Sequence, residues 1–310
     1  MACRGWKGDR RPTITTGGAV LVIALSGDGK WIVSTGRLGT TVWNRGTRQI
    51  AYTVNSKSAY VATLDVSPDS IKFATGSSNK TVIIWAISNG RRLVVLGPHV
   101  NVVTAVRFSP DGDRVAVAVP GQGLHIYEAY GGQSLRFIEA ECSRLNGLVW
   151  LGDSIHIYTL SGSSIKCLHG DKFETLSEWA IPGSLIHDPN GSSGIALPRN
   201  GRFIASFAGR VVTFWNTSTR VRLGPLFEHL QVDNLYSIAL SPDSNYVATG
   251  SNDGMIILRD LKDIIPSSLR VDHTCQFSRL VSCVIRLNAK IGSEMLRTPW
   301  LSSLNQILQA

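Results

Sequence analysis

The stretch SPDG at residues 109–112, followed by VAVAV at 115–119, decides how this chain folds. Proline presets φ at the second position of a tight turn, Asp accepts hydrogen bonds from nearby N–H groups, and Gly tolerates positive φ. A short, β-branched, apolar run after such a turn predicts a buried strand. Residues 102–108, before the turn, have the same character, so the sequence predicts a hairpin here.

The same turn returns at a nearly constant spacing. Ser-Pro-Asp also begins at Ser67 and Ser241, and a variant begins at Ser26. The tripeptide LGD at 151–153 and the tetrapeptide PRNG at 198–201 hold the equivalent places in two weaker copies. Successive copies are therefore 41, 42, 42, 47 and 43 residues apart. A period near forty residues indicates an array of small β units.

Each unit contains four short strands. In the third copy, glycines at 121 and 123 mark a second turn, residues 124–127 form a third strand, and residues 135–138 form a fourth. Four antiparallel strands at this period are typical of a propeller blade. We therefore predict an all-β fold, a β-propeller of four-stranded antiparallel blades. Six blades are recognisable, and an incomplete seventh stays open as an alternative.

The repeats resemble those of the WD-repeat β-propeller family, including fungal WD-repeat proteins. The resemblance covers about residues 14–265, and it is carried by several motifs in phase. These are the Ser-Pro-Asp turns, ATGS at 74–77 and 248–251, Trp-Asn at 43–44 and 215–216, and LGPH at 96–99. Trp85 occupies the same register as the two other tryptophans, with Tyr127 and Arg259 in that place in two copies.

The resemblance implies a buried polar network of His, Ser or Thr, Asp and Trp in each blade, but no copy has all four. The sixth copy has Thr249 and Asp253, yet Arg259 replaces Trp and His229 lies two residues too far upstream. An incomplete buried network contributes less than a complete one. We expect blades that are held mainly by apolar packing and are less stable than a consensus array.

The ends of the chain fall outside the repeats. We expect an irregular basic segment at 1–12, the propeller at 13–272, and at 273–310 a tail, a partial blade or a short helix. Pro12–Thr16 would complete the last blade and close the ring, because an open ring leaves strand edges unpaired. Residues 281–287 could begin a seventh blade, and Thr298-Pro299 could begin a short amphipathic helix.

The overall composition limits the classes of binding partner that we expect. Lys and Arg number 31 against 22 Asp and Glu, a net charge of +9, but the basic residues are spread out. This pattern indicates solvated blade surfaces and disfavours nucleic acid. The apolar run 19–25 is too short to span a bilayer, so we expect no membrane partner. Five cysteines without paired spacing indicate reduced thiols and a cytoplasmic location, with the nucleus as an alternative.

We find no signature of catalysis. The sequence has no phosphate-binding loop, no His-Glu-x-x-His and no Gly-x-Ser-x-Gly elbow. Cys167, His169 and His156 lack the spacing of a structural zinc site, and we interpret them as core and edge residues. We therefore expect no catalytic, cofactor-binding or metal-binding residues.

The resemblance implies a scaffold that binds a protein or peptide on one propeller face, as a monomer within a complex. Carried over by position, the loops of that face mix basic and polar groups, which suit an acidic or phosphorylated segment. The residues are Arg37, Lys57, Tyr60, Ser78, Asn79, His99, Asn101, Gln122, Arg210, Asn252 and Asp253.

Two other functions stay open. Some propellers are enzymes with a channel site, but the strands expected nearest the channel are almost wholly apolar, with only Asp65 and Arg107 as exceptions. The chain is also similar to the eroded WD-repeat arrays that serve as the sensing part of nucleotide-binding switch proteins. It would then be a stand-alone or truncated array.

Overall fold

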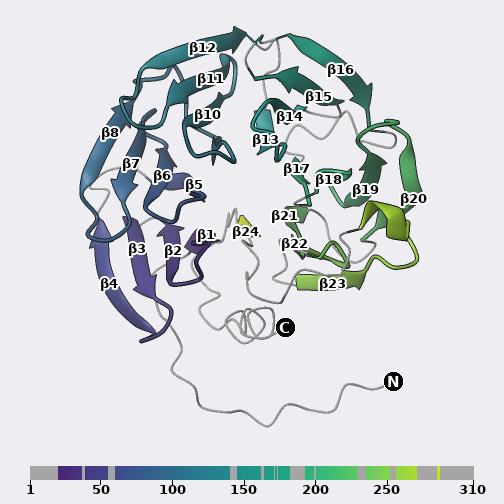
Figure 1. Ribbon diagram of the computed structural model, residues 1–310, viewed down its shortest axis with the longest axis horizontal. Coiled ribbons are helices and arrows are strands. Elements are labelled where there is room, and N and C mark those ends of the chain that lie inside the picture. Colours follow the sequence, from purple (N-terminus) through teal and green to yellow (C-terminus); the bar gives the residue numbers. More distant parts are fainter. Residues whose placement is uncertain are drawn as a thin grey trace.

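The computed structural model is a ring of β-sheets around a central axis (Figure 1). The structure describes residues 20–36, 39–54, 60–139, 145–161, 164–170, 172, 174–181, 193–198, 200–229, 235–241, 243–251, 256–270 and 285–286. The described strands form six sheets, and neighbouring strands within each sheet are antiparallel. The predicted propeller of six blades is confirmed.

The first three blades follow one another along the chain, each with its strands in sequence order from the axis outward. Blade 1 contains β1 (Val20–Leu25), β2 (Trp31–Gly36), β3 (Gly39–Asn44) and β4 (Gln49–Val54). Blade 2 contains β5 (Val61–Val66), β6 (Lys72–Ser77), β7 (Val82–Ala86) and β8 (Arg92–Leu96). Blade 3 contains β9 (Ala105–Phe108), β10 (Arg114–Val119), β11 (Gly123–Glu128) and β12 (Ser134–Glu139).

Blades 4 and 5 repeat this order. Blade 4 contains β13 (Leu145–Trp150), β14 (His156–Ser161), β15 (Ser164–His169) and β16 (Thr175–Ala180). Blade 5 contains β17 (Ser193–Ala196), β18 (Phe203–Ala208), β19 (Val211–Asn216) and β20 (Arg222–Glu228). Blade 6 has three described strands, which are β21 (Leu235–Leu240), β22 (Tyr246–Ser251) and β23 (Ile256–Asp260).

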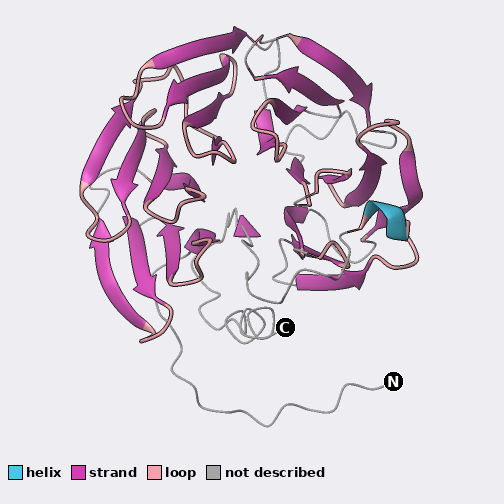
Figure 2. Ribbon diagram, in the orientation of Figure 1, coloured by secondary structure: helices cyan, strands magenta, loops and turns pink. Residues whose placement is uncertain are grey.

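Two features depart from the simple repeat. The expected first strand of the third copy, 102–108, is shorter than predicted and begins at Ala105. After β23 the chain forms the 3₁₀ helix η1 (Ser267–Leu269), shown as a single coil in Figure 2, just after Pro266. Proline lacks the N–H that a further paired strand would use. The main chain of this segment is held against blade 5, where Asn200 Nδ2 donates to Leu269 O at 2.9 Å.

The ring is closed on its inner side by a strand from the C-terminal part of the chain. β24 (Ile285–Arg286) pairs antiparallel with β1 and also contacts β21, so it lies between blades 1 and 6 (Figure 1). The prediction of a strand near 281–287 is confirmed for these two residues, but they extend blade 1 instead of starting a blade of their own. The predicted strand at 12–16 and helix from Thr298 lie outside the described residues.

The turns between the first two strands also link neighbouring blades in two places, between blades 1 and 2 and between blades 3 and 4. In the second copy Ser67 Oγ donates to Asp69 Oδ1 at 2.5 Å, and Asp69 Oδ1 accepts the Ile71 N–H. Ser70 follows with a φ of +63°, where the first, third and fifth copies have glycine. Its hydroxyl accepts the N–H of Asp28 from blade 1 at 3.1 Å. Ser70 therefore makes a hydrogen bond between two blades, although its left-handed backbone conformation is strained for a residue with a Cβ.

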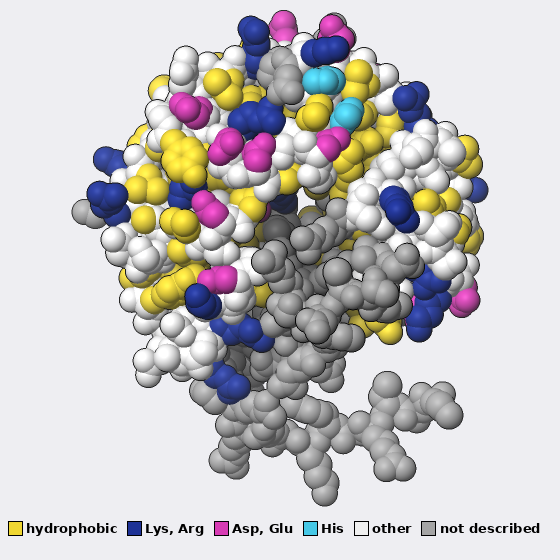
Figure 3. All heavy atoms as spheres, viewed as in Figure 1, with side chains coloured by type: hydrophobic (Ala, Val, Ile, Leu, Met, Phe, Trp, Pro, Cys, Tyr) yellow, Lys and Arg dark blue, Asp and Glu magenta, His cyan; other side chains and the backbone are white. Residues whose placement is uncertain are grey.

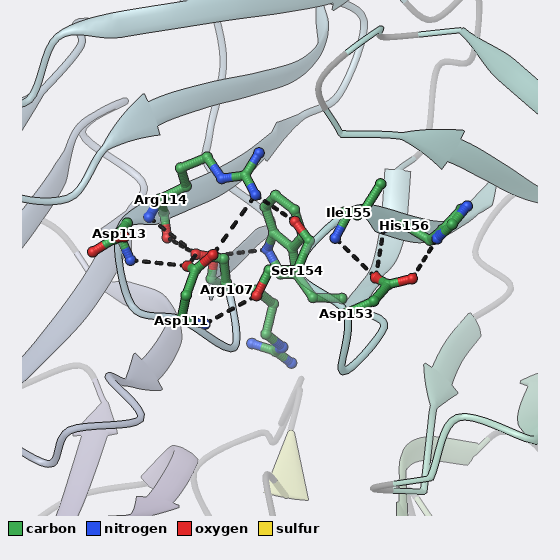
Figure 4. A network of polar contacts seen from close by, with 10 residues as sticks. Arg107, Asp111, Asp113, Arg114, Asp153, Ser154, Ile155 and His156 are labelled. Atoms are coloured by element: carbon green, nitrogen blue, oxygen red, sulfur yellow. Dashed lines mark hydrogen bonds and ion pairs between the residues drawn. The ribbon is translucent and has the colours of Figure 1, made fainter.

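The same link joins blades 3 and 4 (Figure 4). Asp111 N donates to Ser154 Oγ at 3.0 Å, and Ser154 has a φ of +57°. The guanidinium of Arg114 donates to Ser154 O and lies over the ring of Trp150. Turn chemistry that is local in the sequence thus fixes the relative position of adjacent sheets.

Between blades, apolar faces pack closely. The interface of blades 2 and 3 contains Val82, Ile84, Val106 and Val117, all fully buried. The glycine of the ATGS motif permits this approach, because a Cβ at Gly76 would lie 2.5 Å from Val103 Cγ1. The glycine of this motif therefore allows adjacent blades to pack closely.

The predicted polar networks form in part. Trp85 Nε1 donates to Thr75 Oγ1 at 2.8 Å, and Trp43 Nε1 makes the matching bond in blade 1. The prediction that His229 lies too far upstream is wrong, because its Nε2 is 3.5 Å from Thr249 Oγ1. His229 precedes the first residue of β21 by six residues, as His99 precedes the first residue of β9, so the two histidines are equivalent in the structure.

Candidate interaction face and central hollow

The predicted face residues divide into those that the structure describes and those that it does not. Arg37, Lys57, Asn252 and Asp253 lie outside the described residues. The described ones are Tyr60, Ser78, Asn79, His99, Asn101, Gln122 and Arg210. All but Arg210 belong to blades 2 and 3 or to the segment that joins them.

In blade 2, the entry to β5 and the β6–β7 turn are bonded together. Tyr60 O accepts the N–H of Ser78 and the hydroxyl of Ser77, both at 3.1 Å. The Tyr60 side chain itself is 45% exposed. Asn79 Oδ1 accepts both the N–H and the hydroxyl of Thr81, so this side chain is engaged in its own turn.

Blade 3 continues this edge through the segment that precedes β9. His99 N donates to Lys80 O at 2.8 Å, which joins the segment to the turn of blade 2. Val100 N donates to Gln122 Oε1 at 3.4 Å, and Asn101 Nδ2 donates to Pro120 O at 3.4 Å. The structure therefore brings these predicted residues together across two blades.

Sequence reasoning missed two residues of this edge. Val100 is 62% exposed, and Lys80 is exposed with a φ of +70°. Val100 had a signal in the sequence, because it is an apolar residue in a polar connection between strands. Lys80 had none, since a lysine in the left-handed region is identified only from the backbone.

His99 does not contribute its side chain to the face, which corrects the expectation. Its imidazole is 5% exposed and packs against His125, with ring centroids 4.9 Å apart. Burial, with a smaller effect from His125, lowers the pKa of His99 to about 4. The ring also contacts Tyr127, so the side chain is covered by two aromatic residues of β11 in blade 3.

Arg210 lies apart from this edge, on blade 5. Its Nε is 2.7 Å from Glu228 Oε1, so a carboxylate already compensates its charge. An ion pair of two partly exposed side chains is worth little to stability, but it reduces the attraction for an incoming anion. On the face that Figure 3 shows, the acidic and basic side chains of the described residues are interspersed.

A hollow lies on the axis of the ring, where Figure 3 shows a central opening. It has a volume of about 50 Å³, is open to solvent, and is lined by residues of the inner part of all six blades. Representative lining residues are Val22, Thr63, Arg107, Gly147, Gly194 and Ser237. Arg107 is the one charged side chain among the described residues that line it.

Asp65, the second charged residue of the inner strands, bonds to the backbone of the next blade. Its Oδ2 accepts the Phe108 N–H at 2.8 Å. Burial raises the pKa of Asp65, against the opposing effects of the Arg107 charge and of backbone N–H groups. Within the described ranges, no group of three or more His, Cys, Asp or Glu side chains is placed to hold a metal ion. The described helical structure includes no segment with the length and apolarity to cross a membrane.

Comparison with known families matches the repeats directly. The family described as "WD domain, G-beta repeat" matches residues 48–86, 90–122 and 222–260. Two of these segments run from the outer strand of one blade to the third strand of the next, β4 to β7 and β20 to β23. Sequence repeat and structural blade are therefore offset by one strand, which ties adjacent blades together along the chain.

Curated relatives share these repeats over part of their length. Telomerase protein component 1 of Rattus norvegicus is 32% identical over 163 residues, 50% of this chain and 6% of that protein. Protein HIR1 of Kluyveromyces lactis is 24% identical over 235 residues, 70% of this chain and 24% of that protein. Coronin-7 of Rattus norvegicus is 31% identical over 119 residues, 36% of this chain and 13% of that protein. The chain thus spans less than a quarter of each of these proteins.

A solved structure has the same fold. The β-propeller domain of Cps50 (Swd1) from Myceliophteria thermophila superposes with a TM-score of 0.70 at 14% identity. The match covers 82% of this chain and 88% of that one. At this identity the likeness concerns the fold alone. Propellers built from these repeats are in general non-enzymatic and belong to protein complexes.

Proposed function

The chain belongs to the WD-repeat β-propeller family, and from that premise we propose that it is a non-catalytic scaffold that binds a protein or peptide on one face. The site of binding is the exposed edge of blades 2 and 3, which we name the Tyr60 face. It consists of Tyr60, Ser78, Lys80, Val100, Asn101 and Gln122.

The observation that carries this proposal is the pair of exposed apolar side chains in a polar surrounding. Tyr60 is 45% exposed and Val100 is 62% exposed, and backbone hydrogen bonds hold the segments of both residues to the same turn of blade 2. Interfaces commonly have aromatic anchors at the centre and a polar rim that excludes water. Rigid strands position these loops, and their side chains can vary without loss of the fold.

The partner in this proposal is an acidic or phosphorylated segment. Lys80 is exposed at the face, and the chain carries a net charge of +9. Lysine and arginine attract carboxylates and phosphates, and charge-assisted hydrogen bonds to them are about twice as strong as neutral ones. Arg210 is not expected to attract this acidic segment, because its side chain already pairs with Glu228.

Affinity capture with matched tyrosine variants tests the proposal. Tyr60→Ala should remove proteins that the intact chain captures, as measured by quantitative mass spectrometry. Tyr246→Ala is the control, since Tyr246 is 37% exposed but begins β22 next to a Ser-Pro-Asp turn, at the opposite end of its blade. Equal recovery of every captured protein by both variants would discard this face.

The proposal places the scaffold in the cytoplasm, because the five cysteines show no pairing pattern and Cys167 is a free, buried thiol. Microscopy of a fluorescent fusion of the chain checks this. Signal confined to the secretory pathway would contradict it.

A further inference from the structure

We infer that blade 3 contains a buried metal site, in which His99 and His125 bind one copper(I) ion through their imidazole nitrogens. His99 lies on the segment before β9 and His125 lies on β11, and neither residue lines the hollow on the axis. The inference goes beyond the proposed function, because it concerns an ion inside one blade and requires no protein partner.

Both imidazoles are buried, and each has a nitrogen without a hydrogen-bond partner. His99 is 5% exposed and His125 is 8% exposed. The Nε2 atom of each is buried and has no partner among the described residues. A polar atom that is buried without a partner is unfavourable, and native structures usually satisfy such atoms. Two of them in one place therefore point to a bound group that the polypeptide does not supply.

A comparison of blades 3 and 6 shows how the pair arises. In blade 6, Thr249 lies opposite Ile257, and its hydroxyl is 3.5 Å from Nε2 of His229. In blade 3, Val117 takes the place of the threonine and His125 takes the place of the isoleucine. The histidine before the first strand of blade 3 therefore has a second imidazole beside it instead of a hydroxyl partner.

The two rings are close enough to share one ion. The ring centroids of His99 and His125 are 4.9 Å apart, and the ring planes are inclined by 58°. Metal–imidazole bonds of about 2.0–2.1 Å place two nitrogens on one ion no more than about 4 Å apart. Rings at the observed separation allow this distance. Neutral imidazole is the commonest metal ligand in proteins, so the pair has suitable donor chemistry.

The surroundings favour an ion of low charge that needs few ligands. In the described part of the chain, no group of three or more His, Cys, Asp or Glu side chains is placed to hold a metal, whereas zinc sites use at least three protein ligands. None of the ion pairs of the described residues includes His99 or His125. The cost of burying an ion increases with the square of its charge. Copper(I) carries a single charge and accepts two imidazoles.

Aromatic rings complete the site and give the ion a route to it. The ring of Tyr127 is 5.9 Å from that of His99, and the ring of Phe137 is 4.6 Å from that of His125, measured between centroids. Faces of aromatic rings attract cations. Phe137 is 46% exposed on the outer strand β12. Exposed side chains change rotamer within nanoseconds, so movement of Phe137 opens the site from the outer side of the blade.

Anaerobic titration of the intact chain with copper(I), in competition with the chelator bathocuproine disulfonate, tests the site. One readout is the number of ions bound. Because the five cysteines also bind copper(I), the result is the difference from a variant. The variant is Val117→Thr with His125→Ile, which installs the threonine and isoleucine of blade 6 and gives His99 a hydroxyl partner. We expect it to bind one ion fewer than the wild type.

The second readout uses the wild type itself and does not depend on how the variant folds. The Cε1–Hε1 NMR resonances of His99 and His125 should both shift when copper(I) binds, and zinc added instead should leave them in place. His229→Gln is the matched control, since it removes a buried histidine at the equivalent place in blade 6. It should bind as many copper ions as the wild type.

Either of two results overturns the inference. One is equal copper binding by the wild type and the double variant, which would mean that water satisfies the two nitrogens. The other is copper binding that leaves the resonances of His99 and His125 unchanged, which would assign the ion to the cysteines. Shifts caused by zinc and not by copper(I) would also overturn the assignment to a monovalent ion.

Discussion

Acidification should destabilise this propeller through His99, which is 5% exposed and packed between blades. Burial lowers its pKa to about 4, whereas the ordinary value is 6.5. The unfolded chain therefore takes up this proton at a higher pH than the folded chain does. The contribution of the neutral imidazole is fully present above about pH 6.5 and is lost as the pH falls toward about 4.

The magnitude follows from the two values. A difference of one in pKa corresponds to about 1.4 kcal/mol, so protonation of His99 removes about 3 kcal/mol from the free energy of unfolding in total. About 2 kcal/mol of this is lost between pH 7 and pH 5. Burial also lowers the pKa of His125 and of His229, which adds to the loss in the same direction.

Urea unfolding at pH 7 and pH 5, followed by tryptophan fluorescence, measures this loss. The wild type should lose about 2 kcal/mol or more, and His99→Gln should lose about 2 kcal/mol less than the wild type does. Asn101→Ala, a neighbouring exposed position that does not titrate, should keep the wild-type difference. If His99→Gln and the wild type lose the same free energy over this range, the reasoning is refuted.

Three substitutions test the packing of the ring by the same unfolding measurement. Ser70→Ala should cost about 1 kcal/mol because it leaves an N–H of blade 1 without its acceptor, and Ser70→Gly should cost less because it relieves a φ of +63°; equal costs would show that the φ strain is negligible. Gly76→Ala should cost about 1–3 kcal/mol, since the new Cβ would lie 2.5 Å from Val103 Cγ1, and a neutral effect would mean that blade 3 shifts freely. Thr75→Val should cost about 1–2 kcal/mol by removing the acceptor of Trp85 Nε1, and no change in stability would show that water replaces it.

Local chemistry made most of the fold predictable. The Ser-Pro-Asp turns and the short β-branched runs determine hairpins within about ten residues, and their period determines that equal units repeat. The same reasoning located Tyr60, Asn101 and Gln122 in loops of one edge, because each copy places equivalent residues at equivalent heights. The prediction was wrong for the side chains of His99 and His229. Their positions depend on contacts between atoms of different strands, which the repeat pattern does not specify.

The sequence by itself determined that this chain is an array of four-stranded β units, of which six are recognisable, and which residues form their turns. Only the tertiary structure decided that His99 is buried, that β24 joins blade 1, and that Arg107 is the one charged group among the described residues around the hollow. The reason is physical. Turns and strands depend on interactions between residues close in the chain, whereas burial and the hollow depend on sheets that meet only when the ring closes about its axis.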